Sequence, residues 1–380
     1  MRDAAEQPPG AAPDAPTASR AARRTSRVPQ HWVVFSIAAI AVFLMSLDST
    51  LNAIALVDVG AGVGKSSPAQ LSWIVTIYTI FMASTLVAVG SVADRKGRRT
   101  TFLVGLSLFL VGSAIGGASQ AYWMVLSARA VQGVGAAFVF PSSLALVLAV
   151  WPRDETTRVI AMWTAVGAVA GSLGPSIGSW FVDALGWRSA FLVHLPFGGI
   201  ALVRALLLRV DTERRETAPL PDLLGMVLIG IFLGATALVL SQGRSWGWVD
   251  GRVLAASAVA LVTAPVLIWR CRHHPSPVVD LAIFRRTTYR RVTVLAVVLP
   301  AGIFANYTMF PQFLGRVWHY DTFGVGMAIV PFSVGASIAA VIVSRASKRV
   351  DERLLLFGGM VTMIVAVLFL RFVPTEDASY

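Results

Sequence analysis

Long apolar stretches alternate with short polar segments along most of the chain. Eleven of these stretches have about the 20 predominantly apolar residues that a helix needs to cross a bilayer. They are predicted at 33–57, 71–93, 101–118, 123–149, 158–182, 187–208, 223–241, 253–270, 292–314, 323–344 and 353–373. Because a helix satisfies its own backbone hydrogen bonds in lipid, the pattern predicts an all-α integral membrane protein, a bundle of about eleven transmembrane helices.

The composition agrees with this pattern and excludes several classes of function. Only 14% of the residues are charged, against about 25% in soluble domains, and the mean hydropathy is +0.70. These values exclude a water-soluble enzyme. The single cysteine, Cys271, has only His273 and His274 close to it in sequence, so we expect no disulfide and no metal site. No Gly-rich phosphate loop is found either, and we expect no cofactor.

The net charge of +12 is distributed unevenly over the loops. With a cytoplasmic N-terminus, 25 of the 32 Lys and Arg residues fall in the tail and loops on the cytoplasmic side. This bias predicts that the N-terminus lies inside and the C-terminus outside. It also accounts for the positive charge without nucleic acid, so the lipid bilayer, and no nucleic acid, is the expected partner of these basic residues.

Four segments follow from the spacing of the apolar stretches. Residues 1–31, rich in Ala, Pro and Arg, are expected to form a disordered cytoplasmic tail. Residues 32–208 are expected to form a six-helix N-terminal domain, and 209–270 a linker followed by a two-helix insert. Residues 271–380 are expected to contain a cytoplasmic loop and three C-terminal helices. The sequence carries no signal of the oligomeric state.

Few ionisable residues fall at membrane depth, where each costs about 3 kcal/mol or more. Asp48 lies in the first predicted helix and Arg129 in the fourth, and at 1.5 Å per residue both sit in the outer halves of their helices. Asn52 follows Asp48 at i+4 and Gln132 follows Arg129 at i+3, so each pair shares a helix face. We therefore predict a polar cluster of these four residues facing a cavity, where Asp48 could gain and lose a proton. The alternative is a static ion pair that holds two helices together.

Two further segments contain closely spaced glycines. In the fifth predicted helix, Gly167, Gly171, Gly174 and Gly178 form one stripe and Pro175 bends the helix, which suits a hinge or plain close packing. The basic loop, residues 90–99, contains Gly90, Asp94, Arg95, Gly97, Arg98 and Arg99. In this loop Gly97 is expected to permit a tight reversal and Asp94 to accept backbone donors at a helix start.

Together these segments resemble the major facilitator superfamily. The basic loop matches G-x-L-A-D-R-x-G-R-R except at Val92, and residues 129–135 match R-x-x-Q-G-x-G. Residues 167–179 resemble the antiporter motif G-x-x-x-G-x-x-G-P-x-x-G-G, and residues 47–56 resemble the helix 1 motif of the fourteen-helix drug:proton antiporters. The resemblance extends over about residues 32–372, with the motifs in the order that the family has.

The resemblance implies a proton-coupled secondary transporter that exports small amphipathic organic compounds by alternating access at the cell membrane, and not an enzyme. Asp48 would bind substrate or proton and Arg129 would tune it, with Asn306 and Tyr307 contributing from the second half. The basic loop would act as a conformational switch. His194 stands where the family more often has asparagine, and we interpret it as a structural hydrogen-bond donor rather than a proton relay.

The chain departs from the fourteen-helix pattern in its second half, where no counterparts of helices 12 to 14 are found. The C-terminal half would then be incomplete, and Asp94 would lack a partner that the family places near helix 13. Two alternatives follow from this. The first is a truncated homologue of the same fold that does not transport, or that acts as an assembly partner. The second is an uptake symporter, and the helix 5 motif argues against it.

Overall fold

The computed structural model describes residues 29–65, 67–208, 222–320 and 350–372, with scattered residues between 324 and 343. Throughout this described part, every regular element is a helix. The helices are α1 (Gln30–Ile54), α2 (Leu56–Gly62), α3 (Pro68–Lys96), α4 (Arg98–Gly117), α5 (Tyr122–Val150), η1 (Arg153–Glu155), α6 (Thr156–Leu185), α7 (Ser189–Leu192), α8 (His194–Leu207), α9 (Leu223–Trp246), α10 (Gly251–His273), η2 (Leu281–Arg285), α11 (Thr287–Arg316) and α13 (Glu352–Phe372). The chain is thus a helical membrane bundle, as predicted.

The predicted spans coincide with helices wherever they fall on described residues. Within that part of the chain, six helices are long and apolar enough to cross a membrane. They are Gln30–Asn52, Arg98–Gly117, Tyr122–Val150, Ser189–Leu207, Leu223–Trp246 and Gly251–His273. Half of the residues of the predicted span 323–344 lie outside the described part, and the described ones are helical. Most of the predicted tail does too, although its last two residues, Gln30 and His31, belong to the first turn of α1.

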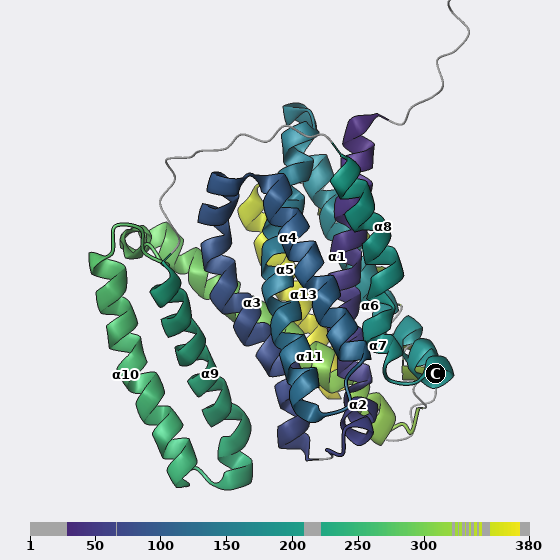
Figure 1. The fold of residues 1–380 in the computed structure, drawn as a ribbon, viewed down its shortest axis with the longest axis vertical. Coiled ribbons are helices and arrows are strands. Elements are labelled where there is room, and N and C mark those ends of the chain that lie inside the picture. The colour runs from purple at the N-terminus through teal and green to yellow at the C-terminus, as the bar shows by residue number, and fades with distance from the viewer. Residues whose placement is uncertain are drawn as a thin grey trace, which may run out of the picture.

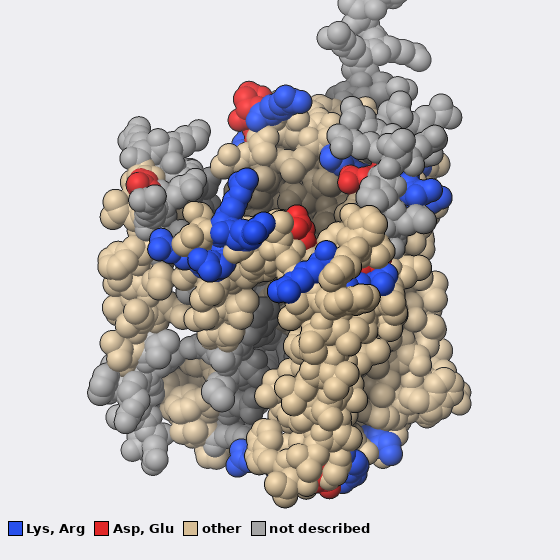
Figure 2. Space-filling model, turned by 90° about the vertical axis from the view of Figure 1, so that its left-hand side faces the viewer, with Lys and Arg blue, Asp and Glu red and all other residues tan. Residues whose placement is uncertain are grey.

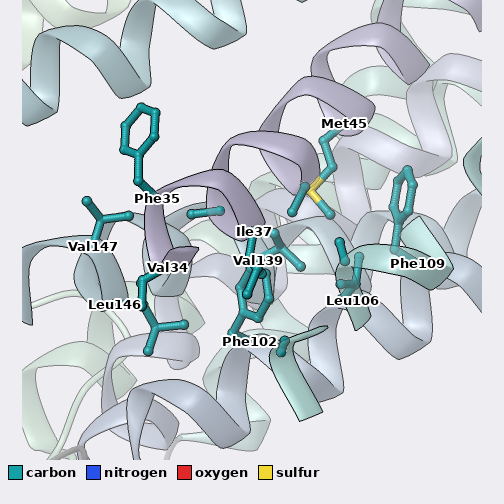
Figure 3. Packing of buried hydrophobic residues seen from close by; sticks show 14 of the residues in the cluster. Val34, Phe35, Ile37, Met45, Phe102, Leu106, Phe109, Val139, Leu146 and Val147 are labelled. Carbon is teal, nitrogen blue, oxygen red and sulfur yellow. The ribbon is translucent and has the colours of Figure 1, made fainter. Parts of the chain in front are cut away.

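The helices α1 and α3 to α8 pack into one bundle (Figure 1). Within it α4 lies along α5, α3 packs on the same helix, and α1 packs against α6. The largest apolar cluster joins Val34 and Ile37 of α1 to Phe102 and Leu106 of α4 and Val139 of α5 (Figure 3). These side chains are almost fully buried, and further residues of α1 are buried as far as Leu51, so the first helix is held inside the bundle along most of its length.

The sixth predicted span is interrupted by one residue, at Val193, between α7 and α8. Pro196 has no N–H and its ring crowds the carbonyl of the residue four positions earlier, which is Leu192, the last residue of α7. This explains why a regular helix is not continuous there. His194 is consequently the first residue of α8, and its side chain is fully buried in the bundle.

The α9–α10 hairpin lies to one side of the bundle, beside α3 (Figure 1). It contains the predicted spans 223–241 and 253–270 and ends three residues beyond the second of them. Asp222 caps α9 by accepting from the Gly225 N–H at 2.8 Å, and Arg270 Nη2 lies 2.7 Å from the same carboxylate. Most large apolar side chains of the hairpin are exposed, as expected for helices that face lipid. The far helices α11 and α13 approach each other where Gly302 lies next to Met363.

Charged side chains gather near the two ends of the face on which the hairpin lies (Figure 2). Most of the Lys and Arg residues seen there lie towards the end where α1 begins, with a few at the opposite end. Between the ends lies a broad surface without charged residues, apart from the parts that are not described. A belt of this kind matches the hydrocarbon layer of a bilayer.

Candidate functional site

The centre of the bundle contains an ion pair between α1 and α5. Arg129 Nη1 lies 2.7 Å from Asp48 Oδ2, and the exposed fractions of the two side chains are 1% and 0%. Since a buried charge is tolerated only when it is paired and hydrogen-bonded, each residue requires the other. The sequence prediction that these two residues meet is borne out by this contact.

The two predicted neighbours complete the polar cluster, which comprises Asp48, Asn52, Arg129 and Gln132. Asn52 Nδ2 donates to Asp48 Oδ1 at 2.9 Å, and Arg129 Nη1 donates to Gln132 Oε1 at 2.8 Å. Gln132 Nε2 in turn reaches Asp48 Oδ1 at 3.3 Å and Ser113 Oγ at 2.9 Å. The carboxylate therefore uses Oδ2 for the arginine and Oδ1 for the amides.

Helix α3 closes the remaining side of the guanidinium. Arg129 Nε donates to the Ile74 carbonyl oxygen at 3.1 Å, and the guanidinium carbon lies 4.3 Å from the centroid of the Tyr78 ring. A cation over an aromatic face is stabilised by the quadrupole of the ring. Neither Tyr78 nor Ser113 is singled out in the sequence, because neutral polar residues are common in membrane helices and carry no distinctive pattern.

The glycines beside the cluster let three helices approach it closely. A Cβ on Gly112 of α4 would come within 2.7 Å of Gln132 Cγ, and one on Gly135 of α5 would come within 2.8 Å of the Gly105 carbonyl oxygen. A Cβ on Gly133 would collide with the Tyr78 carbonyl. The spacing of residues 129–135 therefore has a physical basis: two polar side chains reach the cluster, and two glycines allow α3 and α4 to pack against α5.

The cluster is enclosed in this conformation. Each of its four side chains is at most 1% exposed. We predicted that the cluster faces a cavity, whereas it lies between α1, α3, α4 and α5, with its hydrogen bonds directed at one another. In this low-dielectric setting the ion pair is strong, and separating it requires a proton or another cation to replace the guanidinium.

His194 approaches the same carboxylate from α8. Its Nδ1 lies 3.0 Å from the Phe191 carbonyl oxygen, and its Nε2 lies 3.8 Å from Asp48 Oδ1 without a hydrogen bond. The ring packs edge-on against Phe109, with centroids 5.3 Å apart. We expected His194 to donate an interhelical hydrogen bond. The hydrogen bond with measured geometry instead joins Nδ1 to the preceding turn of its own segment, and the Leu44 carbonyl of α1 is a weaker acceptor beside the ring.

The basic loop joins α3 to α4 and contacts the ends of two other helices. Arg98 Nη1 donates to the Ala145 carbonyl oxygen at 3.2 Å. Arg99 donates to the last carbonyls of α8, from Nε to Ala205 at 3.3 Å and from Nη2 to Leu206 at 2.8 Å. Arginine at a helix C-terminus satisfies unpaired carbonyls and complements the helix dipole.

Two predictions for the basic loop differ in outcome. Gly97 has a φ of 87°, so the reversal between α3 and α4 depends on glycine, as expected. Asp94 was expected at a helix start, but it lies exposed in the last turns of α3, and α4 begins after Gly97 without a side-chain cap. Arg95 lies in the same turns, and Gly90 lies earlier in α3, where a Cβ would meet no atom within 4 Å.

The glycine stripe of α6 faces α1 at three of its four positions. A Cβ on Gly174 would collide with Thr50, one on Gly178 would lie 2.6 Å from Leu51 Cδ2, and one on Gly167 would lie 3.4 Å from Ser46 Oγ. A Cβ on Gly171 would meet no atom within 4 Å. Close packing against α1 therefore accounts for much of the stripe. Pro175 lies in α6, which remains helical from Thr156 to Leu185.

Asn306 and Tyr307 belong to α11, but their side chains are outside the described part of the structure. Their predicted contribution to the site remains a prediction. No grouping of His, Cys, Asp and Glu suited to a metal ion is found among the described residues.

Comparison with known proteins gives a consistent result. The sequence model described as the Major Facilitator Superfamily matches residues 38–379. Multidrug resistance protein Stp of Mycobacterium tuberculosis (strain ATCC 25618 / H37Rv) is 32% identical over 333 residues, covering 87% of this chain and 61% of that protein. The Tetracenomycin C resistance and export protein of Streptomyces glaucescens is 30% identical over 319 residues, covering 83% and 59%.

A solved structure shares the fold. A POT family transporter in complex with 5-aminolevulinic acid matches with a TM-score of 0.57 and 14% identity, over 89% of this chain and 77% of that chain. The chain spans about three fifths of the length of the two resistance proteins.

Proposed function

Since this chain belongs to the major facilitator superfamily, we propose that it is a proton-coupled secondary transporter that exports small amphipathic organic compounds by alternating access. The observation that carries the proposal is the buried pair of Asp48 and Arg129. A carboxylate that must be either paired or protonated can couple proton movement to helix movement. Export, rather than uptake, is favoured by the names of the two relatives, which are resistance proteins.

In this proposal Asp48 exists in two states. When ionised, it holds α5 to α1 through Arg129. When protonated, it no longer balances the guanidinium, and the contact between the two helices weakens because a neutral acid attracts a cation far less. Proton entry and exit would therefore change the packing of α1 against its neighbours, and substrate would cross the membrane as that packing alternates. Asn52 and Gln132 would hold the carboxylate in position in both states.

The basic loop and the α6 glycines would support the same cycle. Arg98 and Arg99 tie the start of α4 to the ends of α5 and α8, and these bonds would form in one state and break in the other. Residues 167–178 would let α1 slide closely over α6. Asn306 and Tyr307 of α11 would contribute to the substrate path from the second half.

We also propose that the N-terminus lies in the cytoplasm and the C-terminus outside. The support is the excess of Lys and Arg in the predicted cytoplasmic segments, where 25 of the 32 basic residues fall. Protons moving inward down their gradient would then drive substrate outward.

The experiment that tests this function uses everted membrane vesicles from cells that produce the chain. Respiration acidifies the vesicle lumen, and a fluorescent amphipathic cation, ethidium, is added while a pH-sensitive dye reports the gradient. We expect ethidium-dependent loss of the gradient with the wild type and none with Asp48→Asn. Asp250→Asn is the matched control, because Asp250 is also paired with an arginine, Arg252, but lies at an exposed helix start.

The relatives that carry the names of resistance proteins are longer than this chain, so transport must be measured on the chain itself. If the wild type leaves the gradient unchanged while it is produced and folded, the chain is a non-transporting homologue or an assembly partner of the same fold. If Asp48→Asn retains the coupling of the wild type, the role of Asp48 is refuted.

A further inference from the structure

Two buried polar atoms in the described residues have no hydrogen-bond partner: Asn52 Oδ1 and His194 Nε2. Both residues border the same carboxylate. Asn52 donates to Asp48 Oδ1, and His194 Nε2 lies 3.8 Å from that oxygen. A buried polar atom without a partner costs about 1–3 kcal/mol, so two of them beside one carboxylate require an explanation.

The partner of the other ring nitrogen assigns the tautomer of His194. Nδ1 lies 3.0 Å from the Phe191 carbonyl oxygen, which can only accept, so in a neutral ring Nδ1 carries the hydrogen and Nε2 presents a lone pair. Nε2 and Asp48 Oδ1 are then two acceptors that face each other with no hydrogen between them. Two facing lone pairs form a place for a proton.

Charged and polar groups from several helices face the imidazole. The Asp48 carboxylate on α1 and the carbonyls of Leu44 and Phe191 are acceptors beside the ring. Arg129 on α5 and the positive end of the α8 dipole bring positive charge to the same place. The phenol of Tyr78 on α3 is the other titratable group of the site, and it lies against the guanidinium.

The two carboxylate oxygens of Asp48 have different partners, and this leaves one of them facing His194. Oδ2 is occupied by Arg129 at 2.7 Å, whereas Oδ1, bonded to Asn52 and Gln132, is the oxygen that faces His194. A proton that binds Nε2 therefore engages Oδ1 first, and this second cation beside the carboxylate then weakens the attraction between Asp48 and Arg129. It would convert the 3.8 Å separation into a charge-assisted N–H···O bond, which has a length of about 2.7–2.9 Å.

We propose that His194 Nε2 and Asp48 Oδ1 together bind the transported proton, which is shared between them. The inference rests on the proposed function and deepens it, because it adds a second titrating residue to the site. One proton enters, an N–H bond forms at Nε2, and the net charge of Asp48, Arg129 and His194 rises from zero to +1. When the proton leaves, that bond breaks and the charge returns to zero. Because His194 is the first residue of α8, proton binding would draw the start of α8 towards α1.

A direct test observes the ring itself. The protein is labelled with ¹⁵N-histidine and placed in nanodiscs, and the ring nitrogen shifts are followed between about pH 5 and pH 8. The chain has five histidines, and the spectrum of His194→Asn identifies the signals of His194. We expect a neutral ring with hydrogen on Nδ1 at high pH and an imidazolium at low pH. In Asp48→Asn the proton affinity of His194 should fall at least tenfold.

A ring that stays neutral over the whole range in the wild type would overturn the proposal. So would a ring whose titration is the same in Asp48→Asn. The shifts are read from the folded protein without any transported compound, so this result does not depend on the choice of ethidium as a probe.

Transport measurements separate this inference from the proposed function. In the vesicle assay we expect His194→Asn and His194→Gln to lose at least tenfold in proton-driven ethidium transport, with an intact folded peak in gel filtration. The control is His273→Asn, at the exposed C-terminal end of α10. If coupling is lost in Asp48→Asn but complete in both His194 variants, the role of His194 is overturned and the proposed function stands. If coupling is retained in all three, both are overturned.

Discussion

Arg129 Nη1 contacts Asp48 Oδ2 at 2.7 Å inside the bundle, where both side chains are shielded from water. Removing one member of such a pair leaves an unbalanced buried charge, which costs about 3–5 kcal/mol. We therefore expect Arg129→Met to lower the free energy of unfolding in SDS by about that amount. The double variant Asp48→Asn with Arg129→Met should recover much of the loss, because it buries no unpaired charge.

The measurement is a double-mutant cycle at one pH in the same detergent. The summed losses in unfolding free energy of the two single variants should exceed the loss of the double variant by more than about 1 kcal/mol. Strictly additive losses would mean that the two residues do not interact in the folded protein.

Gly97 and Gly90 of the basic loop should respond in opposite directions to alanine. Gly97 joins α3 to α4 with φ 87° and ψ 146°, a conformation that is open essentially to glycine alone. Gly97→Ala should cost about 1–3 kcal/mol. Gly90 is helical and a Cβ there meets no atom within 4 Å, so Gly90→Ala should be neutral or stabilise by up to about 1 kcal/mol. Equal effects of the two changes on thermal unfolding would contradict this assignment.

Gly174 and Gly171 distinguish packing from hinge motion in α6. A Cβ on Gly174 collides with Thr50 of α1, so Gly174→Ala should destabilise the protein by about 1–3 kcal/mol and reduce export. Gly171→Ala introduces a methyl group where no atom lies within 4 Å and should leave stability unchanged or slightly raised. Both variants are compared by SDS unfolding and by ethidium transport. Loss of transport in Gly171→Ala at unchanged stability would show that this glycine is needed as a hinge.

The stability of the hairpin of α9 and α10 should depend on pH through Asp222. Burial raises the pKa of Asp222. The hydrogen bonds from Arg270 and the Gly225 N–H lower it by a larger amount, so the pKa lies below its ordinary value. A group with a lowered pKa contributes stability above the unfolded value, about 3.9, and loses it as the pH falls through the folded value. Unfolding measured at about pH 6 and about pH 3 should therefore show a loss that Asp222→Asn removes. The same acid response in that variant would argue against the role of the pair.

The sequence predicts most of the helices and the four-residue polar cluster, because a bilayer restricts both the residues that can form a span and the places where a charge can lie. Only apolar stretches cross a bilayer cheaply, and a charge such as Asp48 or Arg129 must find a partner. Neutral polar side chains cost little, so nothing in the sequence separates Tyr78 and Ser113 from other residues of their helices. Their places in the site become visible only in the packed structure.

The orientation of His194 was beyond sequence reasoning for a different reason. It depends on the packing of α8 against α1, which brings Nε2 to 3.8 Å from Asp48 Oδ1 across a long separation in sequence. The contacts of Arg99 are similar, because they join residues more than 100 positions apart. The predicted cavity beside the polar cluster is contradicted, because all four side chains are buried against neighbouring helices.

The most direct test of proton-coupled export through Asp48 uses the purified chain alone in proteoliposomes with an imposed pH gradient, acid inside. No other protein is present, so any transport belongs to this chain. We expect ethidium to accumulate in the lumen with the wild type and with Asp250→Asn, and Asp48→Asn to give no accumulation above protein-free liposomes. Equal accumulation with the wild type and Asp48→Asn would contradict proton coupling through Asp48.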